Sequence, residues 1–180
     1  FRSRGELPLK ILECHNSEDA AEVITNLNPE LYRPFNMVFA DSSNAYWFKL
    51  FLRNDSYYTH LERVPVGVSI ITSGDLNDLS SPRIRAYLPK FRTAREPDPE
   101  TGNWSDWKLL LSSSRNDRIC GSRGGMVLPI DSGFGTISSS LIALPSTHCV
   151  KRNSATRPIF LFAEFGSLEI SLPKISTFPE

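Results

Sequence analysis

FNMVFADSSNAYWFKLFL, residues 35–52, is the stretch that decides the fold of this chain. Two runs rich in aromatic and β-branched residues, 35–41 and 45–52, flank a polar break at residues 42–44. Such runs favour strands, and a short polar break between them is typical of a hairpin. The stretch therefore predicts two antiparallel strands joined by a tight turn.

Helices and further strands surround this hairpin. The expected helices are residues 5–14, a helix that has Ser17 as N-cap and stops at Asn28-Pro29, a helix that opens at Ser81-Pro82, and residues 104–111, capped by Asn103 or Ser105. The expected strands are 59–64, 66–72, 133–145, 157–165 and 168–172. The run 66–72 is mostly apolar, so we expect it to be buried on both faces.

Strand runs separated by helix pairs indicate the α+β class, with antiparallel sheets covered by helices. The length of 180 residues fits a single domain over residues 1–180. The chain opens on Phe1 and not on methionine, which suggests a fragment or a processed product.

Composition excludes several classes of function. Lys and Arg together number 20, as do Asp and Glu, so no net field favours nucleic acid. No apolar run is long enough for a membrane span, and the start is not a signal peptide, so we expect a cytoplasmic protein. Three widely spaced cysteines and three scattered histidines predict buried free thiols, no metal site and no cofactor.

Polar residues after the run 66–72 are candidates for a site. Asp75 and Asp78 either cap the next helix or lie at the rim of a site. Arg83, in the first turn of that helix, either binds a carboxylate or lies on a solvated face.

Four stretches in order resemble the NRDE-motif family, which includes the transport-and-Golgi-organisation proteins: SRGELPLKIL (3–12), YRPFNMVFAD (32–41), VGVSIITSGDLNDLSSPRI (66–84) and GFGTISSSLIALP (133–145). The resemblance implies a four-layer αββα fold of the N-terminal-nucleophile type, of which this chain is the C-terminal two-thirds. It also implies hydrolysis of an amide C–N bond by a cysteine that follows the initiator methionine. That cysteine is expected on a missing segment upstream of Phe1, so the chain alone should be inactive.

The resemblance also implies roles for residues of this chain. The family strand usually reads G-x-H-x-L-[ST]-N, and Ser69 stands where its His is expected. Ser73 stands in place of the Asn that donates a hydrogen bond to the oxyanion in the family. Loss of one such donor typically lowers the rate by about 10²–10³. The later family motif reads Y-G-T-R-S-S-T, and here Thr136 keeps the threonine whereas Ile137 replaces the arginine.

The resemblance and the departures from its motifs lead to two hypotheses for the function. One is a divergent hydrolase of C–N bonds in a small amide. The other is a non-catalytic relative that binds a small apolar ligand or acts in trafficking, since an aliphatic residue at 137 cannot pair with a carboxylate.

Overall fold

The structure, a computed structural model, describes residues 1–114, 125–130, 135–153 and 155–164. Contacts group the chain into two compact units, residues 1–76 and 77–180. The first unit contains a three-stranded sheet and the second a two-stranded one, and both sheets are antiparallel and accompanied by helices. The predicted α+β class is confirmed, while the four-layer arrangement and the single domain stay predictions.

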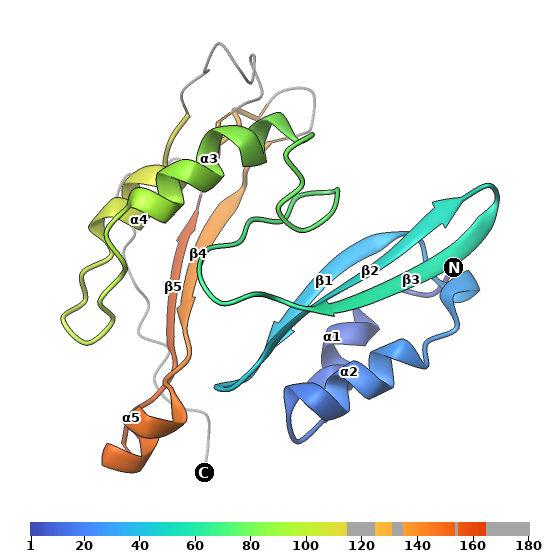
Figure 1. Cartoon of the computed structure of the whole chain (residues 1–180), viewed down its shortest axis with the longest axis horizontal. Helices are drawn as coiled ribbons and strands as arrows, with labels where there is room; N and C mark the ends of the chain where they lie inside the picture. Colours follow the sequence, from blue (N-terminus) through green and yellow to red (C-terminus); the bar gives the residue numbers. More distant parts are fainter. Residues whose placement is uncertain (115–124, 131–134, 154, 165–180) are drawn as a thin grey trace. The chain divides into compact units, whose positions relative to one another are not determined.

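The first unit consists of a pair of helices followed by a meandering sheet (Figure 1). Its elements are α1 (Glu6–Leu12), α2 (Ser17–Thr25), the 3-10 helix η1 (Pro29–Leu31), β1 (Phe35–Ala40), β2 (Ala45–Arg53) and β3 (Ser56–Arg63). The strand order is β1-β2-β3, and Ala40 pairs with Ala45 across the first turn. The hairpin predicted from residues 35–52 is therefore confirmed.

The turn between β2 and β3 consists of two residues, Asn54 and Asp55, whose φ angles are 49° and 59°. Two successive positive φ angles characterise a type I′ turn, whose twist matches that of the flanking strands. This turn starts β3 at Ser56, earlier than the predicted strand 59–64.

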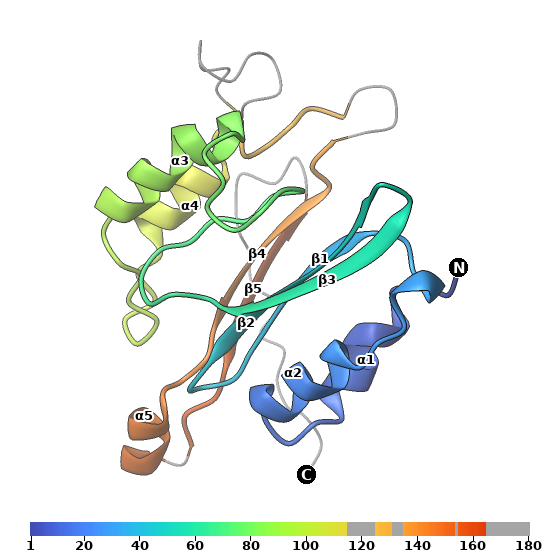
Figure 2. The same ribbon diagram turned by 45° about the vertical axis from the view of Figure 1, so that its right-hand side comes forward.

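One face of the sheet forms the core of the first unit, and α1 and α2 cover it (Figure 2). Phe48 and Leu50 alternate along β2 on this face and are 0% and 1% exposed. They pack with Leu7 of α1 and Ile24 of α2. Period-two alternation sends the intervening residues of each strand to the opposite face.

The predicted strand 66–72 is wrong, because the backbone after β3 forms no ladder there. The last ladder bond runs from the amide of Val64 to the carbonyl of Ala45, at 2.8 Å. Pro65 then has no N–H to donate, and Gly67 has a φ of 100°, outside the range of a strand. Val66 is fully exposed, so the expected burial on both faces is wrong as well.

Helix caps also differ from the prediction. Asn16, not Ser17, is the N-cap of α2, and its Oδ1 accepts the amide of Asp19 at 2.8 Å. Ser17 is the first residue of the helix.

The second unit begins with two helices and continues with a β-ribbon. Its described elements are α3 (Pro82–Thr93), α4 (Ser105–Leu111), β4 (Ser138–Ala143), α5 (Thr147–Arg152) and β5 (Ile159–Glu164). The predicted helix at Ser81-Pro82 is confirmed, with Ser81 as its N-cap. Trp104 is the N-cap of α4, so the expected cap at Asn103 or Ser105 is displaced, although the Asn103 Oδ1 accepts the Ser105 amide at 3.2 Å.

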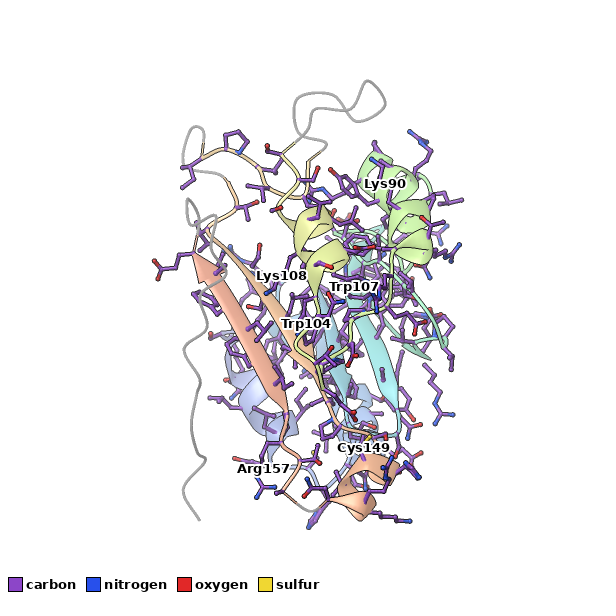
Figure 3. All side chains as sticks on the ribbon, turned by 90° about the vertical axis from the view of Figure 1, so that its left-hand side faces the viewer. Lys90, Trp104, Trp107, Lys108, Cys149 and Arg157 are labelled. Atoms are coloured by element: carbon purple, nitrogen blue, oxygen red, sulfur yellow. The ribbon has the colours of Figure 1, made fainter. Side chains whose placement is uncertain are left out.

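β4 and β5 pair with each other, from Ser138 opposite Glu164 to Ala143 opposite Ile159, which confirms strands within 133–145 and 157–165. Trp104 packs with Leu141 and Leu161 on one face of this ribbon, and Figure 3 shows it with Trp107 at the start of α4. The short α5 was not expected, and residues 168–172 lie outside the described part.

The expectation of buried thiols is wrong for two of the three cysteines. Cys14 and Cys149 are free but partly exposed, and Cys149 lies on α5 (Figure 3). Cys120 lies outside the described residues.

Candidate functional site

The candidate site lies in the first unit, on the sheet face opposite the core. Strand alternation places a set of mostly polar side chains there: Asn36, Trp47, Lys49, His60 and Glu62. The segment that follows β3 is bonded to this face, and it carries Ser73 and Asp75.

Asn36 is the central contact between sheet and segment. Its Nδ2 donates to the carbonyl oxygens of Thr72, at 3.0 Å, and Gly74, at 3.1 Å. Its Oδ1 accepts the indole N–H of Trp47 at 3.1 Å. The two side-chain donors of Asn36 thus hold the 72–73 and 74–75 peptide groups, between which Ser73 and Gly74 lie.

A second contact joins the segment to β2. The Lys49 ammonium forms an ion pair with the Asp75 carboxylate and lies 5.1 Å from the centre of the Phe51 ring. The Lys49 side chain is 21% exposed and that of Asp75 63%, so solvent weakens the pair to about 0–1 kcal/mol. The pair orients the segment more than it stabilises the fold.

Asp75 and Asp78 do not cap α3, so that alternative is wrong. The Oγ of Ser81 fills the capping position and accepts the amide of Ile84 at 3.5 Å. Asp78 accepts the amide and hydroxyl of Ser80.

Ser73 is exposed between the two carbonyl groups that Asn36 holds. Within the described part of the chain its hydroxyl makes no hydrogen bond, so it can donate to an external oxygen. Ser69 lies earlier in the same segment and is half-buried. An exposed hydroxyl on a tethered backbone is suited to stabilising negative charge on a ligand.

His60 adds a titratable group to this face. Its Nε2 lies 3.1 Å from Oε2 of Glu62, and its ring meets that of Trp47 edge-on at 5.3 Å. His60 is directly opposite Lys49 in the β2–β3 register. The sequence reasoning missed Asn36, Lys49 and His60 as site residues, although each falls at an outward position of the alternating pattern.

The other predicted site residues belong to the second unit. Arg83 lies in the first turn of α3, with its Nε buried. Thr136 is bonded to Leu128: its Oγ1 accepts the amide of Leu128 at 2.9 Å, and its own amide donates to the Leu128 carbonyl at 3.0 Å. Ile137 is 72% exposed. The structure thus brings Ser73 and Asp75 together with Asn36, and it leaves the role of the second-unit residues a prediction.

An open hollow of about 210 Å³ lies at the β2–β3 turn, lined by Phe51, Arg53, Asn54 and Tyr58. Phe51 and Tyr58 stack with their ring centres 5.7 Å apart. The hollow is smaller than the roughly 300–1,000 Å³ of ordinary small-molecule pockets.

Within the described ranges, no three His, Cys, Asp or Glu side chains gather as metal ligands would. None of the helices described has the length and apolar character of a membrane span. No family model, curated protein or solved structure matches the chain. The resemblance to the NRDE-motif family therefore stays a prediction.

Proposed function

We propose that this chain forms part of a divergent N-terminal-nucleophile hydrolase that cleaves the C–N bond of a small amide. The observation that carries the proposal is Ser73, an exposed residue between Thr72 and Gly74, whose carbonyl groups Asn36 binds. This is the residue that the family resemblance assigns to the oxyanion. The four-layer arrangement belongs to the same proposal, and a sheet covered by helices on one face is compatible with it.

The chemistry needs a nucleophile that the resemblance assigns to a segment before Phe1. A cysteine thiolate attacks the amide carbonyl, and the electron pair of the C=O bond moves to the oxygen. The Ser73 hydroxyl donates to that oxyanion while the α-amine of the cysteine carries the proton to the leaving nitrogen. Collapse of the intermediate breaks the C–N bond and leaves a thioester, which water then hydrolyses.

Ser73→Ala in the full-length protein tests the role of the hydroxyl. Loss of one oxyanion donor is expected to lower kcat/KM for small chromogenic anilides by about 10²–10³. The unfolding midpoint should stay unchanged because the side chain is exposed. Ser43→Ala is the matched control, since Ser43 is also exposed and only its amide is bonded, to Asp41. Equal turnover in both variants contradicts the proposal, as does an upstream coding sequence without Met-Cys.

The alternative is a non-catalytic relative that binds a small apolar ligand or acts in trafficking. Two observations favour it: Ile137, in place of the family arginine, is exposed, and two of the four residues that line the hollow at the β2–β3 turn, Phe51 and Tyr58, are aromatic. Native mass spectrometry of the purified protein tests this alternative. A retained small molecule supports it, whereas covalent labelling of an N-terminal cysteine by an electrophilic amide contradicts it.

A further inference from the structure

Both ends of the Asn36 side-chain amide form hydrogen bonds, and its NH2 end contacts the two residues that flank Ser73. The carbonyl end accepts from Trp47, which is 3% exposed and therefore has little choice of partner. The NH2 end then faces the segment, and its two hydrogens meet the carbonyl oxygens of Thr72 and Gly74. Because the indole donates, it fixes which end of the amide points at the segment.

These contacts connect parts of the chain that are distant in sequence. The bonds from Asn36 span 36 and 38 residues, and they reach the segment that follows β3. The ion pair of Lys49 with the more exposed Asp75 adds a second side-chain contact between the segment and the sheet. The two half-buried hydrogen bonds from Asn36 therefore restrain directly the peptide groups around Ser73.

We propose that Asn36 is a positioning residue that holds in place the backbone that carries the Ser73 hydroxyl, with Trp47 selecting the orientation of the Asn36 amide. The role of Ser73 itself rests on the proposed function. The restraint of Asn36 on residues 72–75 does not rest on the proposed function, because it follows from the hydrogen bonds alone.

Asn36→Asp tests the restraint with almost no change of shape. A carboxylate still accepts from Trp47, but it turns an oxygen toward the two carbonyl oxygens where the NH2 donated. The backbone order parameters of residues 72–75, measured by NMR relaxation, should fall from about 0.85 to below about 0.6. The indole N–H signal of Trp47 should persist, which shows that the sheet beneath is intact.

A pH titration separates positioning from general damage. When the carboxyl introduced by Asn36→Asp is protonated, it becomes a donor to one of the two carbonyl oxygens. The order parameters of residues 72–75 in this variant should therefore rise again as pH falls through the pKa of that carboxyl, which faces Lys49 across the β1–β2 register. Asn16→Asp is the matched control, since Asn16 uses only its oxygen, as a cap, and Asp caps equally well.

The outcomes separate the two proposals. Ordered residues 72–75 in Asn36→Asp at neutral pH overturn the positioning role, whatever Ser73 does. Loosened residues 72–75 that tighten in acid support it, even if Ser73→Ala leaves turnover unchanged and the hydrolase proposal fails. If both proposals hold, Asn36→Asp lowers kcat by at least about tenfold with a smaller change in KM. If Asn36→Asp loses both the Trp47 indole signal and the order of the whole sheet, the variant is unfolded, and the separate role of Asn36 is overturned.

Discussion

Asp41 joins the beginning of α2 to the β1–β2 turn, and Asp41→Asn should weaken that junction. One carboxylate oxygen accepts the amide and the hydroxyl of Ser17, at 2.9 and 2.7 Å. The other accepts the amides of Ser43, at 2.7 Å, and Asn44, at 2.8 Å. These bonds, the Ser17 amide foremost, hold the pKa of Asp41 well below its ordinary range.

The geometry sets the size of the effect. In the variant the amide oxygen can still accept from Ser43 and Asn44, so its NH2 faces Ser17. The Ser17 hydroxyl can rotate and accept from that NH2, but the Ser17 amide loses its acceptor. Ser17 is 4% exposed, and a buried donor without a partner costs about 1–3 kcal/mol. We expect the free energy of unfolding to fall by about 2 kcal/mol at pH 7.

The difference between the two proteins should depend on pH. The folded pKa of Asp41 is lower than the unfolded one, so the unfolded state binds more protons in acid. Its stabilising contribution is therefore complete above about pH 5 and is lost as pH falls from there. Because Asp41→Asn removes this titration, the stability gap between the proteins should narrow toward about pH 2.

Two measurements compare Asp41→Asn with the unaltered protein. Urea unfolding gives the difference in the free energy of unfolding, and hydrogen exchange of peptides from β1 and β2 reports on the first unit. Asp98→Asn is the control, because Asp98 also accepts two amides, from Glu100 and Thr101, but in an exposed loop. It should leave the exchange of β1 and β2 unchanged. Equal midpoints for Asp41→Asn and the unaltered protein at pH 7 refute the reasoning, as does a gap that stays constant into acid.

Two more predictions concern the sheet of the first unit. Phe48→Ala removes a fully buried ring and should lower the free energy of unfolding by about 3–5 kcal/mol in urea titrations, whereas a loss below about 1 kcal/mol contradicts its central place in the core. Asp55→Gly should raise stability by about 0.5–1 kcal/mol, because glycine adopts the positive φ of the second turn position without strain. A lower thermal midpoint contradicts the type I′ assignment.

Local patterns predicted the elements that depend on neighbours in sequence. The hairpin of residues 35–52 could be predicted because both of its signals, strand-forming runs and the polar break between them, extend over only a few residues. The helix that begins at Ser81-Pro82 could be predicted for a similar reason, since a serine cap and a proline in the first turn are local signals. The predicted strand 66–72 was wrong because apolar character does not specify a ladder partner. The ladder ends at Val64, before Pro65, and Gly67 within the run has a φ outside the range of a strand.

The site depended on contacts that no local pattern records. Ser73 was a candidate by resemblance and Asp75 by its place after an apolar run, but their surroundings required the β1–β2–β3 register, which places Asn36 beside Trp47 and Lys49 beside His60. Sequence by itself determined the α+β class, the hairpin and the balance of charge, because these follow from residue type and short-range spacing. Only the tertiary structure decided which side chains hold the Ser73 segment, because a bond from Asn36 to Thr72 exists only after the intervening 36-residue separation is closed by folding.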